Sequence, residues 1–151
     1  MAVSRAVFLD KDGTLVEDVP FNVDPLRIRL APGVAEGLPL LRAAGFRLFV
    51  VSNQSGLARG LFDEEELEAA MQRLQELTTD LGVPLDGFYH CPHHPGGSVP
   101  RFARACDCRK PAPGMILAAA EEHGLDLGSS WFVGDILTTS RRAAGPAAAR
   151  P

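Results

Sequence analysis

Apolar runs alternate along this chain with segments whose apolar residues are spaced as in a helix. Four runs predict buried strands: Ala6–Leu9, Phe46–Val51, Asp86–His90 and Ser130–Val133. Three segments with apolar residues three or four positions apart predict helices: Pro32–Ala44, Asp63 to about Leu81, and Pro113–Gly124. Because strand and helix alternate, the predicted fold class is α/β, a parallel sheet with helices on both faces.

Three segments follow neither pattern. Val16–Arg29 is interrupted by two prolines, so we expect a loop there, either part of a substrate-facing cap or an ordinary surface loop. Cys91–Arg109 is rich in proline and glycine and is expected to be irregular. Arg141–Pro151 lacks strand character, and from Ala143 onward we expect a frayed tail.

Composition places the chain among ordinary globular proteins. Its 151 residues are 46% hydrophobic and 23% charged, which predicts a single domain spanning 1–151. The net charge of −4 argues against a nucleic-acid partner. Met1–Arg5 lacks the apolar stretch of a signal peptide, and no run reaches membrane-spanning length, so we expect a cytoplasmic location and no membrane partner. A monomer is expected over an oligomer.

Two acids, Asp10 and Asp12, directly follow the first predicted strand. Two carboxylates one residue apart repel each other and therefore favour a divalent cation, and Gly13 permits the sharp turn that directs both into a cleft. A carboxylate beside Mg²⁺ can attack phosphorus, while a second can transfer the proton of the leaving group. A calcium-binding loop and an ordinary polar turn are the alternatives for this stretch considered alone.

The later strands also lead into polar residues. The second ends in Ser52-Asn53, the third is followed by Arg109-Lys110, and the fourth by Asp135. The carboxyl ends of parallel strands share one edge of the sheet, where open α/β folds bind ligands, so these side chains are expected to converge.

Four ordered motifs resemble those of the haloacid-dehalogenase-like (HAD) phosphatases. They are Asp10-Lys-Asp-Gly-Thr14, Ser52-Asn-Gln-Ser-Gly-Leu-Ala-Arg-Gly60, Cys106-Asp-Cys-Arg-Lys-Pro111 and Asp135. The resemblance covers about residues 5–136. The second and third motifs resemble the small branch without a large cap that contains histidinol-phosphate phosphatase and heptose-bisphosphate phosphatase.

The resemblance implies a role for each motif. Asp10 would be the nucleophile, forming an aspartyl-phosphate, and Asp12 would be the general acid and base. The side chains of Asp10 and Asp135 and the backbone carbonyl of Asp12 would bind Mg²⁺. Ser52 and Lys110 would hold the transferring phosphoryl group.

Further residues of these motifs would bind the substrate: Asn53, Gln54, Ser55, Arg59 and Arg109. Arg59 and Arg109 are candidates for recognising the remote part of an anionic substrate, because a guanidinium group gives forked recognition. A solvated surface arginine is the alternative for Arg59.

Cys91-x-His93 and Cys106-x-Cys108 together offer a complete tetrahedral ligand set for Zn²⁺. With no position left for water, such a site would be structural, and its binding free energy would order the loop from about 91 to 108. The heptose-bisphosphate phosphatase branch has the same Cys/His placement. Three free thiols are the alternative. His90 and His94 flank the site and are expected to be exposed or to lie beside the ligands.

The chain departs from the family after Asp135. The family usually has an acid three or four residues later, where this chain has Thr138 and Thr139, which accept hydrogen bonds but carry no charge. The family also continues for another strand and helix, so the C-terminal strand is expected to be missing.

The predicted function is that of a Mg²⁺-dependent phosphatase acting on a small phosphorylated metabolite. A sugar phosphate of the heptose-bisphosphate type is favoured, and histidinol phosphate is second. A catalytically impaired phosphate-binding protein is an alternative. A polynucleotide-end phosphatase shares the motifs, but the acidic balance argues against it.

Overall fold

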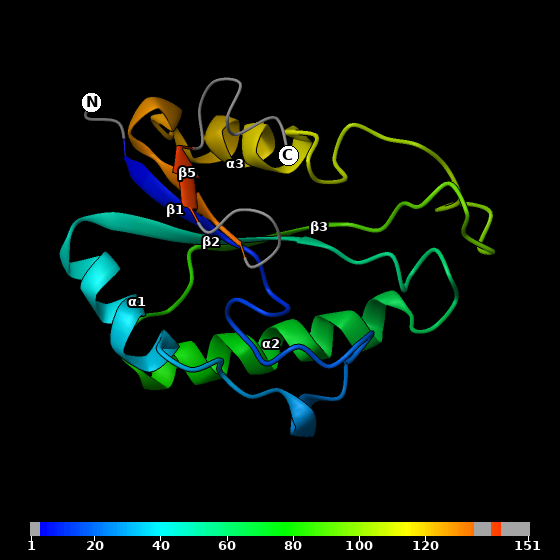
Figure 1. Cartoon of the computed structure of the whole chain (residues 1–151), viewed down its shortest axis with the longest axis horizontal. Helices are drawn as coiled ribbons and strands as arrows, with labels where there is room; N and C mark the ends of the chain where they lie inside the picture. The colour runs from blue at the N-terminus through cyan, green and yellow to red at the C-terminus, as the bar shows by residue number, and fades with distance from the viewer. Residues whose placement is uncertain (1–3, 135–139, 143–151) are drawn as a thin grey trace.

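The computed structural model describes residues 4–134 and 140–142, which form one twisted sheet with helices packed on it (Figure 1). The described strands are β1 (Arg5–Leu9), β2 (Phe46–Asn53), β3 (Gly87–Cys91), β4 (Trp131–Val133) and β5 (Ser140–Arg142). They lie in the order β3-β2-β1-β4-β5; the first four run parallel, and β5 pairs antiparallel with β4.

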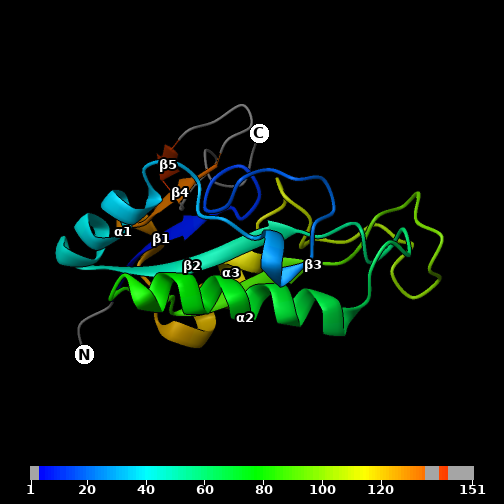
Figure 2. The same ribbon diagram turned by 90° about the horizontal axis from the view of Figure 1, so that it is seen from below.

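The helices cover both faces of this sheet. They are α1 (Val34–Ala43), α2 (Glu64–Asp80) and α3 (Gly114–His123), with short 3₁₀ turns at η1 (Pro25–Arg27) and η2 (Leu127–Ser129). α1 and α2 lie on one face and α3 on the other, as Figures 1 and 2 show from two directions. Among the described residues, no helix combines the length and the apolar character that crossing a membrane requires.

The two central strands are buried on both sides. Alternate residues of β1 and β2 pack against α1 and α2: Val7, Leu9, Leu48 and Val50. The residues between them pack against α3: Ala6, Phe8, Phe49 and Val51. Strands buried on both faces read as continuous apolar runs rather than alternating ones, which is why the sequence predicted β1 and β2 so directly.

The sequence-based prediction of the four parallel strands and three helices is confirmed, with every boundary within two residues of its predicted position. Asp63 caps α2 through a hydrogen bond from the Glu66 backbone N–H (2.8 Å), and the Glu66 carboxylate accepts from the Asp63 backbone N–H (3.1 Å). α1 continues through Pro39 without a break.

One expectation at the C-terminal end is wrong. Arg141 and Arg142, placed in a run without strand character, belong to β5, whose residues pair with Trp131–Val133 of β4. A three-residue strand is too short to give a detectable alternation of apolar and polar residues. The expected frayed tail lies outside the described residues, as do Asp135, Thr138 and Thr139.

Beyond the carboxyl ends of the strands, the segment after β2 and the long loop after β3 lie side by side (Figures 1 and 2). The backbone N–H groups of Ser98 and Val99 both donate to the carbonyl of Ala58, at 2.8 and 2.9 Å. A Cβ on Gly97 would lie 2.6 Å from the same carbonyl oxygen, so only glycine allows this close approach. The two segments carry the second and third HAD-like motifs and are joined by these bonds.

Candidate active site

Three of the four predicted strand ends meet at one edge of the sheet. Asp10 follows β1, Ser52 and Asn53 end β2, and Lys110 lies in the loop that follows β3. The Lys110 ammonium Nζ is 2.9 Å from Asp10 Oδ1. Gly134 follows β4 and lies beside Asp10, since a Cβ built on it would be 4.0 Å from the Asp10 Cβ. The fourth predicted residue, Asp135, is outside the described residues.

The Asp10 carboxylate is held by one of its two oxygens. Oδ1 accepts a hydrogen bond from the Lys11 backbone N–H (2.8 Å) and faces the Lys110 ammonium group. No hydrogen bond from the described residues reaches Oδ2. Burial raises the pKa of Asp10, against the opposing effects of Lys110 and of the Lys11 N–H, and the negative charge of Asp12 raises it further. A cation at this position would keep the carboxylate ionised.

Asp12 is held at both oxygens. Its Oδ1 lies 2.6 Å from Lys11 Nζ, and its Oδ2 accepts from Gln54 Nε2 (3.3 Å). Gln54 Nε2 also donates to Ser52 Oγ (2.7 Å), so one buried amide connects the first and second motifs. This link was missed in the sequence, although strand alternation places residues 52 and 54 on the same side of the chain.

Lys11 was not singled out from the sequence, yet it is only 1% exposed. A buried ammonium group needs a nearby negative charge, and Asp12 supplies it. The backbone beyond it turns at Gly13, whose φ of 82° favours glycine, and the N–H groups of Leu15 and Val16 both donate to the Lys11 carbonyl (3.0 Å each). This turn fixes the two aspartates relative to each other.

Asn53 was predicted to bind substrate, but its side-chain amide is engaged with the Lys110 main chain. The Lys110 N–H donates to Asn53 Oδ1 (2.9 Å), and Asn53 Nδ2 donates to the Lys110 carbonyl (3.2 Å).

The predicted substrate-binding arginines lie around His94. Arg59 is exposed, and its Nη2 is 3.3 Å from His94 Nε2. Arg109 is half-buried, and its Nη1 has no hydrogen-bond partner among the described residues. Partial desolvation and the charges of Arg109 and Arg59 lower the pKa of His94. Ser55 begins the turn that carries Arg59, because its carbonyl accepts from the Arg59 N–H (3.0 Å).

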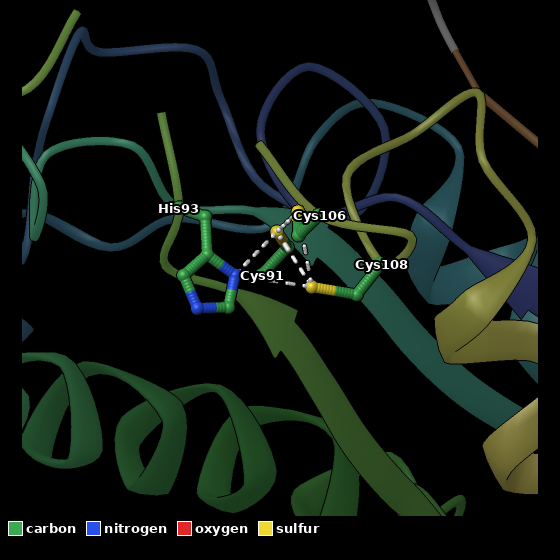
Figure 3. A group of neighbouring side chains, drawn as sticks. All are labelled: Cys91, His93, Cys106 and Cys108. Carbon is green, nitrogen blue, oxygen red and sulfur yellow. Dashed lines mark hydrogen bonds between the residues drawn. The ribbon is translucent and has the colours of Figure 1, made fainter. Parts of the chain in front are cut away.

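The two Cys/His pairs converge on one point (Figure 3). Cys91 is the last residue of β3, and the other three residues come from the loop that follows it. The Cys91 sulfur lies 3.4 Å from that of Cys106 and 2.9 Å from that of Cys108. His93 Nδ1 lies 3.4 Å from the Cys108 sulfur and 3.7 Å from the Cys91 sulfur.

Apart from the shorter Cys91–Cys108 separation of 2.9 Å, these distances of 3.4–3.7 Å are close to those of a tetrahedral zinc site. With Zn–S and Zn–N bonds of usual length, the edges of the tetrahedron are about 3.5–3.8 Å, and no sulfur pair is at disulfide distance. Burial, together with the hydrogen bond to Cys108, raises the pKa of the Cys91 thiol, so a thiolate there needs a neighbouring cation. Of the flanking histidines, His90 is exposed, and His94 Nδ1 accepts from the Gly96 N–H (2.9 Å).

The fold and the paired aspartates after β1 define a phosphatase of the HAD-like class. Residues 6–146 match the polynucleotide kinase 3 phosphatase family, and the chain belongs to this family of HAD-like phosphatases.

Curated relatives and solved structures agree with this assignment. The D-glycero-beta-D-manno-heptose-1,7-bisphosphate 7-phosphatase of Yersinia pestis is 44% identical over 130 residues, covering 86% of this chain and 69% of that protein. The protein of the same name from Escherichia coli K12 is 43% identical over 138 residues, covering 91% of this chain and 72% of that protein.

Two solved structures resemble the chain closely. A candidate HAD-like phosphatase from Mesorhizobium loti has a TM-score of 0.84 and 38% identity, covering 89% of this chain and 65% of that one. The D,D-heptose 1,7-bisphosphate phosphatase of B. bronchiseptica was solved with magnesium and phosphate. It has a TM-score of 0.74 and 33% identity, covering 87% of this chain and 70% of that one.

Proposed function

We propose that the chain removes the 7-phosphate of a heptose 1,7-bisphosphate through an aspartyl-phosphate formed on Asp10. The observation that carries the proposal is the arrangement of this carboxylate. One oxygen is held by the Lys11 N–H and the Lys110 ammonium group, while Oδ2 accepts no hydrogen bond from the described residues. The identity to heptose-bisphosphate phosphatases supports the substrate class.

In the first half of the reaction, Asp10 Oδ2 attacks the phosphorus atom and the bond from phosphorus to the sugar oxygen breaks. Asp12 acts as the general acid: it transfers a proton to that leaving oxygen and is left as the carboxylate that pairs with the Lys11 ammonium group. The Lys110 ammonium group and the Ser52 hydroxyl would stabilise the charge on the transferring phosphoryl oxygens. The contact of Lys110 with Asp10 supports its part in this role.

In the second half, water attacks the phosphorus atom of the aspartyl-phosphate, and Asp12, now a carboxylate, takes the proton of the water. The acyl phosphate bond breaks, inorganic phosphate is released and Asp10 is restored. Gln54 and Lys11 keep the Asp12 carboxyl group beside the reacting atoms in both halves.

The residues at this edge of the sheet suit Mg²⁺, which prefers hard oxygen ligands. The Asp10 carboxylate, the Asp12 carbonyl and, as predicted from the sequence, Asp135 would hold it. When bound, the ion would supply positive charge against the nucleophile and the phosphate. The raised pKa of Asp10 supports the need for such a charge.

A bisphosphate substrate keeps a second phosphate away from the reacting centre. Arg59 and Arg109 are proposed to bind it, and their convergence around His94 supports this assignment. His94 Nδ1 accepts from the Gly96 N–H, so in the neutral ring Nε2 carries the proton and faces the Arg59 guanidinium group as a second donor. An anion placed between the two donors would satisfy both.

Zinc is proposed as a structural ion in the Cys91, His93, Cys106 and Cys108 site. This site ties the loop to β3 and directly precedes Arg109 and Lys110 in the chain. The proposal also includes a single domain over 1–151 that acts as a monomer on a small sugar phosphate and not on nucleic acid.

The test is phosphate release from four probes, each with Mg²⁺ and with a chelator. The probes are heptose 1,7-bisphosphate, histidinol phosphate, an aryl phosphate and a 3′-phosphorylated oligonucleotide. We expect the highest kcat/KM for the heptose bisphosphate, dependence on Mg²⁺, and no activity in Asp10→Asn. Preference for histidinol phosphate or the oligonucleotide would replace the proposed substrate, and no release from any probe would favour a phosphate-binding protein.

A further inference from the structure

The side-chain amide of Asn53 and the main chain of Lys110 form a two-sided contact between β2 and the loop after the zinc ligands. The Lys110 N–H donates to Asn53 Oδ1 (2.9 Å), and Asn53 Nδ2 donates to the Lys110 carbonyl (3.2 Å). Asn53 is the last residue of β2 and pairs in the sheet with the zinc ligand Cys91. The amide therefore extends from a rigid strand to a segment without helix or strand.

Lys110 needs such support, because its loop gives it little. No other hydrogen bond from the described residues reaches the main chain of Lys110. Its side chain has to place Nζ 2.9 Å from Asp10 Oδ1, with the two side chains 18% and 21% exposed. A lysine side chain has four rotatable bonds, so a shift of its backbone changes where the ammonium group rests.

We propose that Asn53 is a positioning residue that fixes Lys110 against Asp10, and that it is not a substrate ligand. The inference rests on the proposed phosphatase reaction for its kinetic test. The oxygen and the nitrogen of the Asn53 carboxamide both bond to the main chain of Lys110, so protein contacts alone orient the amide. This role differs from the substrate contact that the sequence predicted for this residue.

The two roles make opposite kinetic predictions. A lost substrate contact raises KM and depends on the substrate, whereas a misplaced Lys110 lowers kcat for every phosphate ester, including an aryl phosphate. A displacement of about 1 Å in an active site can cost about 100-fold in rate. For Asn53→Ala we expect a fall in kcat of about 10- to 100-fold with aryl phosphate and little change in KM.

A double-mutant cycle links the loss to Lys110. Asn53→Ala is compared in the wild-type background and in the Lys110→Met background, with aryl phosphate as the probe. If Asn53 acts through Lys110, its loss changes kcat by less than about twofold once the ammonium group is absent. Equal losses in both backgrounds, or a raised KM with an unchanged kcat, would overturn the inference.

The chain contains a matched control for the cost of removing such a contact. Gln75 of α2 makes the same two-sided contact with the Leu85 main chain: the Leu85 N–H donates to Oε1 (2.8 Å) and Nε2 donates to the carbonyl (2.9 Å). Gln75→Ala is expected to lower the melting temperature as Asn53→Ala does, while leaving kcat unchanged. A similar fall in kcat in both variants would show a general loss of structure and overturn the inference.

A crystallographic comparison separates failure of this inference from failure of the proposed function, because it needs no catalysis. In Asn53→Ala the distance from Lys110 Nζ to Asp10 Oδ1 is expected to exceed ion-pair range, and in Gln75→Ala it is expected to stay near 2.9 Å. If Asn53→Ala fails to fold, Asn53→Asp keeps the acceptor for the Lys110 N–H and loses the donor to its carbonyl. An undisturbed Lys110 in the variant would refute the positioning role.

Discussion

The Lys110 ammonium group lies 2.9 Å from Asp10 Oδ1, although the two residues follow different strands of the sheet. The pair is about four-fifths buried, so water screens it less than a surface ion pair. Together with the Lys11 N–H it occupies Oδ1 of the carboxylate, while Oδ2 accepts no hydrogen bond from the described residues. It also places a positive charge next to the position that a transferring phosphoryl group would take.

Replacing Lys110 with methionine tests this charge. Methionine keeps much of the side-chain length, so we expect kcat to fall while the fold is retained. Loss of one preorganised donor to a developing charge costs about 100- to 1,000-fold in kcat. Steady-state kinetics with an aryl phosphate would measure the effect, and the melting temperature would confirm folding. A kcat within about threefold of wild type would contradict a role for Lys110 in stabilising the reaction.

The sequence predicted most of what places the reacting groups. The runs of β1 and β2 are continuous because both faces are buried, so their ends located Asp10 and Ser52 correctly at one edge of the sheet. The Cys/His spacing likewise predicted four candidate ligands, and these residues do converge. These features depend on the order of residues along the chain and on the general geometry of parallel sheets.

Contacts set by loop conformation were not predicted. The burial of Lys11 beside Asp12 was not expected. The Gln54 contact with Asp12 and the Asn53 contact with Lys110 each join segments distant in sequence. No periodicity specifies which amide meets which backbone group. β5 was missed because three residues carry too little pattern.

Substitutions of two neighbouring histidines, His93 and His94, test the proposed zinc site. His93 Nδ1 lies within 3.7 Å of two thiol sulfurs, whereas His94 Nδ1 accepts from a backbone N–H and faces Arg59 through Nε2. We expect His93→Ala to lose zinc and to melt at a lower temperature, because metal binding supplies folding free energy to the loop. His94→Ala is expected to keep about one zinc ion per chain. Elemental analysis of both variants measures their zinc content. Equal zinc content in the two would show that His93 is not a ligand.

Tyr89 provides a pH prediction at the edge strand β3. Burial, together with the hydrogen bond from its hydroxyl to Glu122 Oε1 (2.9 Å), raises the pKa of Tyr89 to about 12. A pKa that is higher in the folded than in the unfolded protein makes the free energy of unfolding depend on pH. The contribution of Tyr89 to stability is complete below pH 10, the pKa in the unfolded chain, and is lost as pH rises from 10 to about 12.

The measurement is direct because the chain contains a single tyrosine. An ultraviolet titration of tyrosinate in the folded protein should give a midpoint well above 10. Glu122→Gln should lower that midpoint, since the amide oxygen can still accept the hydrogen bond but carries no charge; burial, the larger cause, remains. A midpoint at the ordinary value of 10 in the wild type would contradict the contact.

Recognition of a second phosphate is the property that separates a bisphosphatase from a general phosphatase. Arg109 adjoins Lys110 in the chain and has a buried Nη1 without a partner among the described residues, which leaves a donor for a ligand. A hydrogen bond to a charged group contributes about 1.5–3 kcal/mol, so Arg109→Ala should raise KM for a sugar bisphosphate about 10- to 100-fold. KM for an aryl phosphate, which lacks the second anion, should stay within about twofold.

Arg104→Ala is the matched control, because Arg104 is an exposed arginine of the same loop that contacts His93 Nε2 (3.0 Å). It removes the same charge at a similar position in the chain but is not assigned to the substrate. If the two variants raise KM for the bisphosphate equally, the effect is a general loss of positive charge and Arg109 makes no specific contact with the substrate. If Arg109→Ala raises KM equally for the bisphosphate and the aryl phosphate, the guanidinium group acts on the reacting phosphate and not on the remote one.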